Sequence, residues 1–266
     1  MLQAMGLRVW QTPAAPAAPP APSAPPATSP APSLAAAAPA TSALPAAAPA
    51  AGAAGVPLGP PPRAAPAPGA LALDWPALRA AVAACRACGL CESRTQTVFG
   101  VGHVNARWMI VGEAPGEQED RQGEPFVGPS GQLLDAMLRA LGLSRADDGP
   151  PEQRVYIANT LKCRPPRNRN PAPAEMLECE PFLVRQIELV QPRIIVAMGR
   201  FAVQALLRSS EPIGRLRGRV HRYQGVPLVV TYHPAYLLRS LADKARAWED
   251  LCLAAGIAEA APGAAP

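Results

Sequence analysis

The sequence lacks the long apolar run that a membrane-spanning helix would need. Its 266 residues contain no stretch of about 18 apolar residues free of proline and charge, so we expect no membrane span. The opening residues MLQAMGLRVWQT also lack the continuous apolar core of a secretory signal. Together these absences predict a soluble protein that stays inside the cell.

The first 70 residues are poor in charge and in large apolar side chains. They hold 18 of the 35 prolines and two charged residues, Arg8 and Arg63. Proline at this density removes backbone N–H donors, and too few large apolar side chains remain to offset the ordering entropy. We therefore expect a disordered Pro/Ala-rich tether at 1–72, a folded domain at 73–258 and a disordered tail at 259–266. The composition does not identify a protein partner for the tether.

Positive charge is modest overall but locally concentrated. The formal net charge is +5, of which the tether supplies +2, and the remaining excess is too mild to define a partner. Arginine is concentrated in RPPRNRN at 164–170 and in RLRGRVHR at 215–222. Such segments suit contacts with phosphate groups, although a solvated surface has the same composition.

Helical and strand patterns alternate from Asp74 onward, where an N-cap Asp and an early Pro open the first helix. This alternation predicts an α/β fold with an open, mostly parallel sheet covered on both faces. Its ligands would gather at the carboxyl ends of the strands. The expected helices are 74–88, 130–142, 171–190, 200–208 and 243–256, and the expected strands lie within 106–116, 154–160, 192–199, 218–223 and 226–234.

Four of the six cysteines are spaced as ligands of one metal centre. Cys85 and Cys88 form a C-x2-C, which lets two thiolates reach one centre from a single turn, and Cys163 and Cys179 flank a proline-rich loop. Spacing alone does not distinguish zinc from an iron–sulfur cluster, and it leaves open that Cys163 and Cys179 are core residues.

The other two cysteines are less easily assigned. Cys91 ends a second C-x2-C and could take the place of Cys88, so spacing leaves the choice of ligand open. Cys252 falls on the apolar side of the last expected helix, where we expect a core residue.

Four segments together resemble the family 4 uracil-DNA glycosylases, the iron–sulfur branch of that superfamily. They are CRACGLCESRTQTVFG, VGEAPGEQEDRQGEPFVGPSGQLLD, NTLKCRPPRNRNPAPAEMLEC and TYHPAYLLR. The resemblance runs from about Cys85 to the end of the last helix. It implies a three-layer sandwich around a central, mostly parallel four-stranded sheet, with a structural [4Fe-4S] cluster on Cys85, Cys88, Cys163 and Cys179.

The resemblance also implies the activity: excision of uracil from DNA in base excision repair, which leaves an abasic site and free uracil. The partner would be uracil-containing DNA, single- or double-stranded. We expect a monomer without membrane contact, in the cytoplasm and associated with a bacterial-type nucleoid.

The family pattern assigns a pocket for an extruded base. Phe126 would stack on the uracil, Asn159 would read its edge, and His233 would lie near O2, where charge develops as the glycosidic bond breaks. Glycines in the first loop would let backbone amides approach the base. The implied uracil-binding residues are Gly112, Glu113, Ala114, Pro115, Phe126, Asn159 and His233.

Catalysis calls for a carboxylate that orients water near the sugar C1′. The best-known relatives carry an Asp before the Pro of the first loop, where this sequence and the family 4 pattern have Ala114. Glu113 is therefore the first candidate and Glu119 the second, together with His233 as the donor to O2. Alternatively, Glu119 would line the pocket near uracil C5 and help to exclude the methyl group of thymine.

The remaining motif residues suit contact with the DNA around the base. Leu237 or Leu238 would enter the base stack as an apolar wedge, although helix packing accounts equally for both. The residues expected to contact the phosphate backbone are Arg164, Arg167, Arg169 and Arg239.

Three alternatives compete with this interpretation. Relatives that trap their product covalently use a histidine in the loop after the third cysteine, and residues 164–178 contain none. A DNA-binding module without catalysis would not need Glu113, Phe126, Asn159 and His233 together. A zinc protein would use the same four thiolates, and the absorbance of the purified protein distinguishes it from an iron–sulfur protein.

Overall fold

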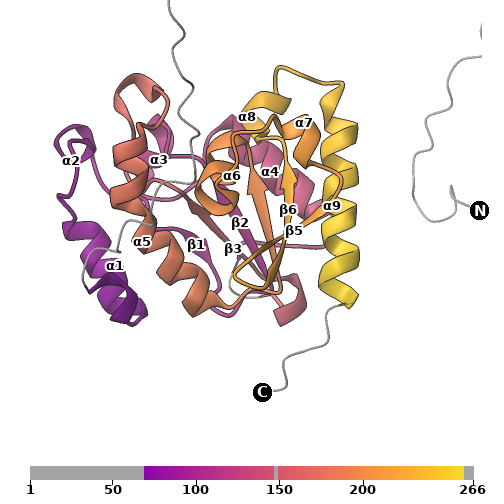
Figure 1. Ribbon diagram of the computed structural model, residues 1–266, viewed down its shortest axis with the longest axis horizontal. Coiled ribbons are helices and arrows are strands. Elements are labelled where there is room, and N and C mark those ends of the chain that lie inside the picture. The colour runs from indigo at the N-terminus through magenta and orange to yellow at the C-terminus, as the bar shows by residue number, and fades with distance from the viewer. Residues whose placement is uncertain (1–68, 147–148, 261–266) are drawn as a thin grey trace, which may run out of the picture. The chain divides into compact units, whose positions relative to one another are not determined.

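The computed structural model describes residues 69–146 and 149–260 (Figure 1). Most of the expected tether and most of the expected tail therefore lie outside the described residues. Residues 70–72 form a short 3-10 turn with Ala70 buried, and the last helix continues to Ala260. The described fold thus reaches slightly beyond the expected limits of 73 and 258 at both ends.

The described residues contain one six-stranded sheet with the strand order β1-β3-β2-β4-β6-β5. Its four inner strands are parallel, and β1 and β5 join the two edges in the antiparallel direction. The parallel core has the four strands that the resemblance implies, β5 matches the expected strand within 218–223, and β1 was not expected. The strands are β1 (Val101–Gly102), β2 (Trp108–Gly112), β3 (Val155–Asn159), β4 (Ile194–Met198), β5 (Val220–Tyr223) and β6 (Val226–Thr231).

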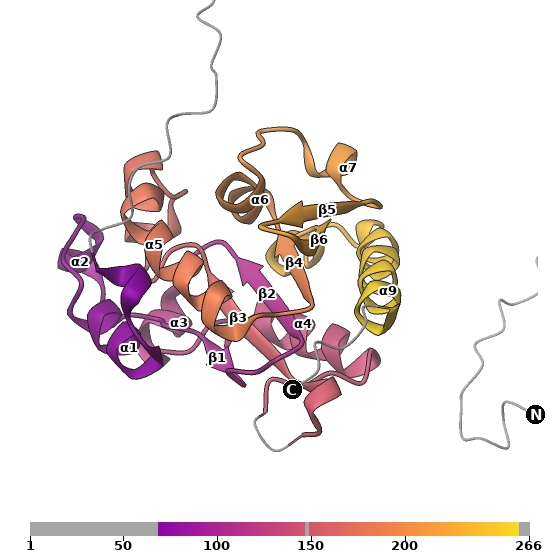
Figure 2. The same cartoon turned by 60° about the horizontal axis from the view of Figure 1, so that its bottom comes forward.

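Helices cover both faces of the sheet, which confirms the expected α/β sandwich (Figure 2). Side chains on a strand alternate between the two faces, so Met109 and Val111 pack with α5 and α6, whereas Trp108 and Ile110 pack with α4 and α9. The helices are α1 (Trp75–Ala84), α2 (Leu90–Ser93), α3 (Glu117–Gln122), α4 (Pro129–Ala140), α5 (Pro173–Val190), α6 (Arg200–Leu207), α7 (Ile213–Leu216), α8 (Pro234–Leu237) and α9 (Asp243–Ala260). None of these described helices has the length and apolar character needed to cross a membrane.

The strand register brings distant motifs to one edge of the sheet. Gly112 at the end of β2 pairs with Asn159 at the end of β3, and Met198 at the end of β4 pairs with Thr231 at the end of β6. His233 lies two residues after the end of β6 and is the N-cap of helix α8. Parallel pairing therefore places the loops after β2, β3 and β6 side by side.

A third, smaller core lies beside the sheet. Leu78 and Val82 of α1 and Leu90 of α2 pack with Leu161, Phe182 and the cysteines. Asp74 caps α1, because its side chain accepts a hydrogen bond from the Ala77 N–H at 2.9 Å. This packing positions the C-x2-C segment against the loop after β3.

Candidate active site

A cavity of about 290 Å³ lies at the carboxyl ends of the parallel strands. Most of the expected uracil-binding residues line it, although they come from four separate stretches of the chain. The lining also includes residues from the Arg-rich loop and from the first turn of α4. The lining residues are Glu113, Ala114, Pro115, Gly116, Glu119, Phe126, Ser130, Asn159, Pro165, Asn168, Arg169, His233 and Ala235.

Asn159 occupies the buried wall of this cavity. Its side chain is 3 % exposed, and its Oδ1 is a buried oxygen without a hydrogen-bond partner among the described residues. A buried polar atom without a partner is costly, so an unpaired oxygen facing a cavity indicates a ligand that supplies a donor. Gly112 leaves the necessary room: a Cβ there would lie 2.5 Å from Asn159 Oδ1 and 2.6 Å from Phe126 Cζ.

Two parallel rings form another part of the cavity lining. The rings of Phe126 and His233 stack with their centroids 5.4 Å apart and their planes at 28°. Phe126 has a φ of 56°, in the left-handed region that a bulky residue rarely adopts. Arg145 holds this turn by donating hydrogen bonds to the carbonyl oxygens of Pro125 at 2.8 Å and Phe126 at 3.2 Å. No sequence motif pointed to Arg145.

His233 is held as a neutral donor. The backbone N–H of Ala235 donates to its Nδ1 at 3.2 Å, so we assign the ring proton to Nε2. Desolvation lowers the pKa of His233 to about 4, and the carboxylate of Glu119 only partly opposes this. At neutral pH the imidazole therefore carries no charge and presents one N–H donor.

The buried imidazole makes stability depend on pH. The pKa of His233 is about 4 in the folded protein and 6.5 ordinarily, so the unfolded chain binds the extra proton between these values. We expect the contribution of His233 to the free energy of unfolding to be fully present above pH 6.5 and to be lost as the pH drops from 6.5 to 4. Denaturant titrations at several pH values measure this. His233→Gln should weaken the dependence, and an unchanged dependence in this variant would contradict the assignment.

The two candidate acids have different surroundings. Glu119 accepts three backbone hydrogen bonds, from Gly116 and Val127 at 3.0 Å and from Gly128 at 3.1 Å. Its carboxylate thus ties the start of α3 to the loop that carries Phe126, although it also faces the cavity. In the part of the chain that the structure describes, no hydrogen-bond donor pairs with the Glu113 carboxylate. Burial raises the pKa of Glu113, and Arg200 opposes the shift.

The Arg-rich loop after Cys163 contacts the cavity through one of its three arginines. Arg169 lines the cavity and pairs with Glu175, with Nη1 2.9 Å from Oε2. Arg164 donates to Asn168 Oδ1 at 2.8 Å and pairs with Glu117 on α3. Arg167 is exposed and lies outside the cavity lining.

The two candidate wedge leucines have opposite environments. Leu237, on the buried side of α8, is 0 % exposed in this structure. Leu238 is 43 % exposed and Arg239 is also exposed. Only Leu238 of the pair is therefore accessible to DNA.

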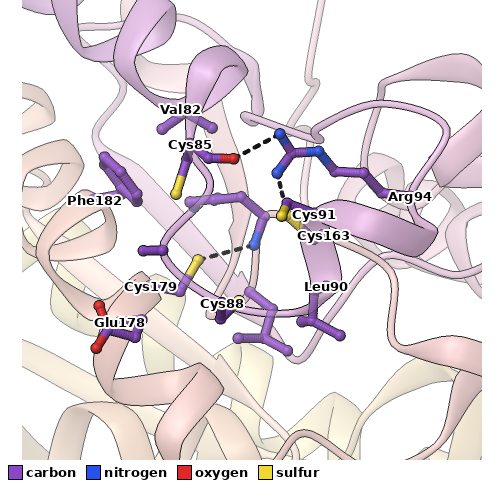
Figure 3. A pocket seen from close by; sticks show the side chains of 13 residues that line it. Val82, Cys85, Cys88, Leu90, Cys91, Arg94, Cys163, Glu178, Cys179 and Phe182 are labelled. Carbon is purple, nitrogen blue, oxygen red and sulfur yellow. Dashed lines mark hydrogen bonds between the residues drawn. The ribbon is translucent and has the colours of Figure 1, made fainter.

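A second cavity brings five cysteine side chains together (Figure 3). The four expected ligands and Cys91 all line it, so five of the six thiols meet although they lie far apart in sequence. Cys252 is exposed on α9, and the expectation that it is a core residue is wrong. The buried face of α9 consists of other residues, Ala247, Asp250, Leu251, Ala254 and Ala258. The cysteines around the cavity are Cys85, Cys88, Cys91, Cys163 and Cys179.

The surroundings of these thiols fit thiolate ligands. The guanidinium of Arg94 donates to Cys163 Sγ at 2.9 Å, and the backbone N–H of Lys162 donates to Cys179 Sγ at 3.2 Å (Figure 3). Burial raises the pKa of Cys163 and raises that of Cys179 to about 12, so a bound metal would have to displace their protons. No group of three or more His, Cys, Asp or Glu side chains within the described ranges is arranged to hold a single metal ion.

Hydrogen bonds join the thiol cavity to the first cavity. Lys162, which is 1 % exposed, donates from Nζ to the Asn159 carbonyl at 2.8 Å and to Gln186 Oε1 at 2.6 Å. The Thr95 N–H, next to Arg94, donates to both Asp120 carboxylate oxygens at 3.0 Å. In the sequence, Asn159 stands three residues before Lys162, but the sequence reveals neither contact. The cysteine core thus holds both Asn159 and α3.

The fold and its two sites define an α/β protein with a pocket for a planar polar ligand beside a thiol-lined cavity. The family model described as the Uracil DNA glycosylase superfamily matches residues 99–252. The chain belongs to this superfamily and, by its similarity to curated relatives, to the type 4 family within it.

The similarity extends over most of each type 4 relative. The chain is 44% identical to the type-4 uracil-DNA glycosylase of Archaeoglobus fulgidus over 165 residues, which cover 59% of this chain and 79% of the relative. It is 40% identical to the type-4 enzyme of Pyrobaculum aerophilum over 191 residues, covering 68% and 93%. The type-5 uracil-DNA glycosylase of the same organism is 38% identical over 146 residues, covering 51% and 64%.

Proposed function

We propose that the protein is a uracil-DNA glycosylase of DNA repair, which takes uracil out of DNA and hydrolyses its N-glycosidic bond. The observation that carries this proposal is the unpaired Asn159 Oδ1 in a cavity lined by Phe126 and His233. The products are free uracil and an abasic site in the DNA.

Asn159 discriminates uracil from cytosine by its pattern of donors and acceptors. Its Oδ1 accepts from uracil N3–H and its Nδ2 donates to O4, whereas cytosine presents an acceptor at N3 and a donor at the fourth ring position. The Phe126 ring offers the stacking face that offsets the loss of base stacking in DNA. Both contacts need the close approach that Gly112 permits.

His233 and Glu113 carry the chemical step. As the glycosidic bond breaks, negative charge develops on the uracil, and the Nε2–H of neutral His233 donates to O2 where that charge appears. The sugar becomes electron-poor at C1′, and the Glu113 carboxylate orients the attacking water there. Glu119 acts mainly as a brace, since its oxygens already accept backbone hydrogen bonds.

A [4Fe-4S] cluster on Cys85, Cys88, Cys163 and Cys179 would fix this architecture. Its role would be structural: the thiolates of Cys85 and Cys88, of Cys163 after β3 and of Cys179 in α5 would be held together by iron. Four thiolates can bind either zinc or an iron–sulfur cluster. Similarity to the family 4 enzymes, the iron–sulfur branch of the superfamily, favours the cluster.

The surface around the pocket suits DNA. Arg169 lies at the pocket and Arg164 and Arg167 lie beside it, where they would contact phosphate groups. Leu238 would enter the base stack next to the extruded uracil, and Arg239 would pair with phosphate.

The decisive test is excision of uracil from an oligonucleotide with a single uracil. We expect alkali to cleave the strand at that position after incubation with the protein, and to leave a cytosine control strand intact. Free uracil should appear in equal amount. An iron-containing, folded protein that leaves the uracil strand intact would favour a DNA-binding module without catalysis.

The pH profile of excision tests the role of Glu113. Because burial raises the pKa of this carboxyl, we expect kcat/KM to fall on the acid side at a pH above its ordinary value of 4.5. Glu113→Gln should lower the rate by about 10²-fold or more and remove the acid limb. Glu117→Gln, on the exposed side of α3, provides the matched control, and an unchanged acid limb in Glu113→Gln would assign the limb to another group.

The adjacent leucines separate DNA contact from packing. Leu238→Ala should change stability by less than about 0.5 kcal/mol but lower excision from double-stranded DNA by about tenfold, with little effect on single strands. Leu237→Ala should cost about 2–5 kcal/mol of stability, because it leaves a cavity in the core. Thermal unfolding and excision assays on both substrates measure the two effects. If both variants excise uracil from double-stranded DNA at the wild-type rate, the wedge role is rejected.

A further inference from the structure

The thiol cavity contains one more cysteine than a four-thiolate cluster uses. Cys91 lines it together with the four expected ligands. It stands three residues after Cys88, as Cys88 stands three after Cys85, so the segment reads C-x2-C-x2-C. Neither the structural requirements of α2 nor the pocket for uracil explains a fifth thiol here.

Three of the expected ligands are firmly anchored. Arg94 donates to the Cys85 carbonyl at 2.7 Å and to Cys163 Sγ at 2.9 Å, so one guanidinium fixes both (Figure 3). Cys179 is buried within α5 and receives the Lys162 N–H. These contacts come from side chains and segments outside the C-x2-C-x2-C turn.

Cys88 is held differently. It lies half-buried in the bend before α2, and the backbone N–H that contacts its thiol belongs to its near neighbour Leu90. The Cys91 N–H donates to the Cys88 carbonyl at 3.2 Å, so the two cysteines share one turn. A Cβ on Gly89, between them, would meet no atom within 4 Å. Both thiols therefore line the same cavity from one turn, whose Gly89 side is open.

We propose that Cys91 is an alternative ligand for the iron that Cys88 binds, so that either thiolate completes the cluster. The inference rests on the cluster in the proposed function. In the exchange, the Cys88 thiolate would leave iron as the Cys91 thiolate binds it, and the thiol proton of Cys91 would pass through solvent to Cys88. No electron is transferred. The exchange gives the cluster tolerance to loss or chemical blocking of Cys88, its more weakly anchored ligand.

Alanine variants of the turn test this directly. Iron and sulfide content and the absorbance band at about 400 nm are measured for Cys88→Ala, Cys91→Ala and the double variant, with Cys85→Ala as the matched reference. We expect both single variants to retain nearly full cluster content and the double variant to lose it at least about tenfold. The single substitution Cys85→Ala should be enough to lose the cluster, because no neighbouring thiol replaces Cys85.

Each other outcome overturns the proposal in a distinct way. Loss of the cluster in Cys88→Ala alone means that Cys91 cannot bind, and loss in Cys91→Ala alone makes Cys91 the sole ligand. Retention in the double variant means that neither cysteine binds iron. Uracil excision by the wild-type protein is measured in parallel. An iron-containing wild type without excision rejects the proposed activity and leaves the ligand test intact, whereas a wild type without iron rejects the cluster itself.

Discussion

Asn159→Ala is expected to lower kcat/KM for uracil excision by about 10³-fold, because it removes the donor and the acceptor that read the base edge. The loss should fall mainly on uracil recognition, since Phe126 and His233 keep their positions. In the free protein, its Oδ1 has no hydrogen-bond partner among the described residues. Stability should therefore change little or even rise.

The same substitution at Asn170 provides the control, because this asparagine lies in an exposed part of the Arg-rich loop. Single-turnover rates with a saturating excess of protein separate the chemical step from DNA binding, and circular dichroism confirms the fold. A loss of less than tenfold in Asn159→Ala, or an equal loss in Asn170→Ala, would contradict the assigned reader.

Cys179→Ala is expected to remove the cluster and most of the stability of the protein. Cys179 joins α5 to the loop after β3, and that loop also carries Lys162, which holds Asn159. Binding of a structural metal contributes free energy directly to folding, and typical domains have only about 5–15 kcal/mol of stability in total. We therefore expect the visible absorbance to disappear and cooperative thermal unfolding to be lost or shifted far down.

Cys252→Ala tests whether this effect is specific to the cavity. Cys252 is exposed on α9 and lies outside the thiol cavity, so its variant should keep the absorbance, the thermal midpoint and the activity of the wild type. A Cys179→Ala protein that loses iron but unfolds at the wild-type temperature would show that the cluster does not support the fold.

Local patterns in the sequence predicted most of the architecture. Hydrophobic periodicity predicted the long helices and the parallel strands. A helix that is buried on one face, or a strand that is buried on both, has a characteristic spacing of apolar residues along the sequence. Gly112, Phe126, Asn159 and His233 follow from motifs whose spacing matches a known family, and the parallel order of the strands brings them to one pocket. Short elements such as β1 and α8 carry too few residues for a periodic signal.

The tertiary structure alone decided which residues are exposed and which long-range partners they have. Leu237 and Leu238 are identical neighbours in the sequence, yet packing against the core buries the first and leaves the second exposed. Cys252 is outside because α9 buries a different face. Arg145 lies outside the motif segments, and Lys162 lies within one without an assigned role. The roles of both depend on carbonyl groups that folding brings within hydrogen-bond distance. The sequence by itself determined the family, the elements and the chemistry of the pocket, since these depend on local pattern. The exposure of side chains, the long-range hydrogen bonds and the cavity lined by five cysteines depend on contacts between segments that are distant in the chain. Only the folded structure specifies these contacts.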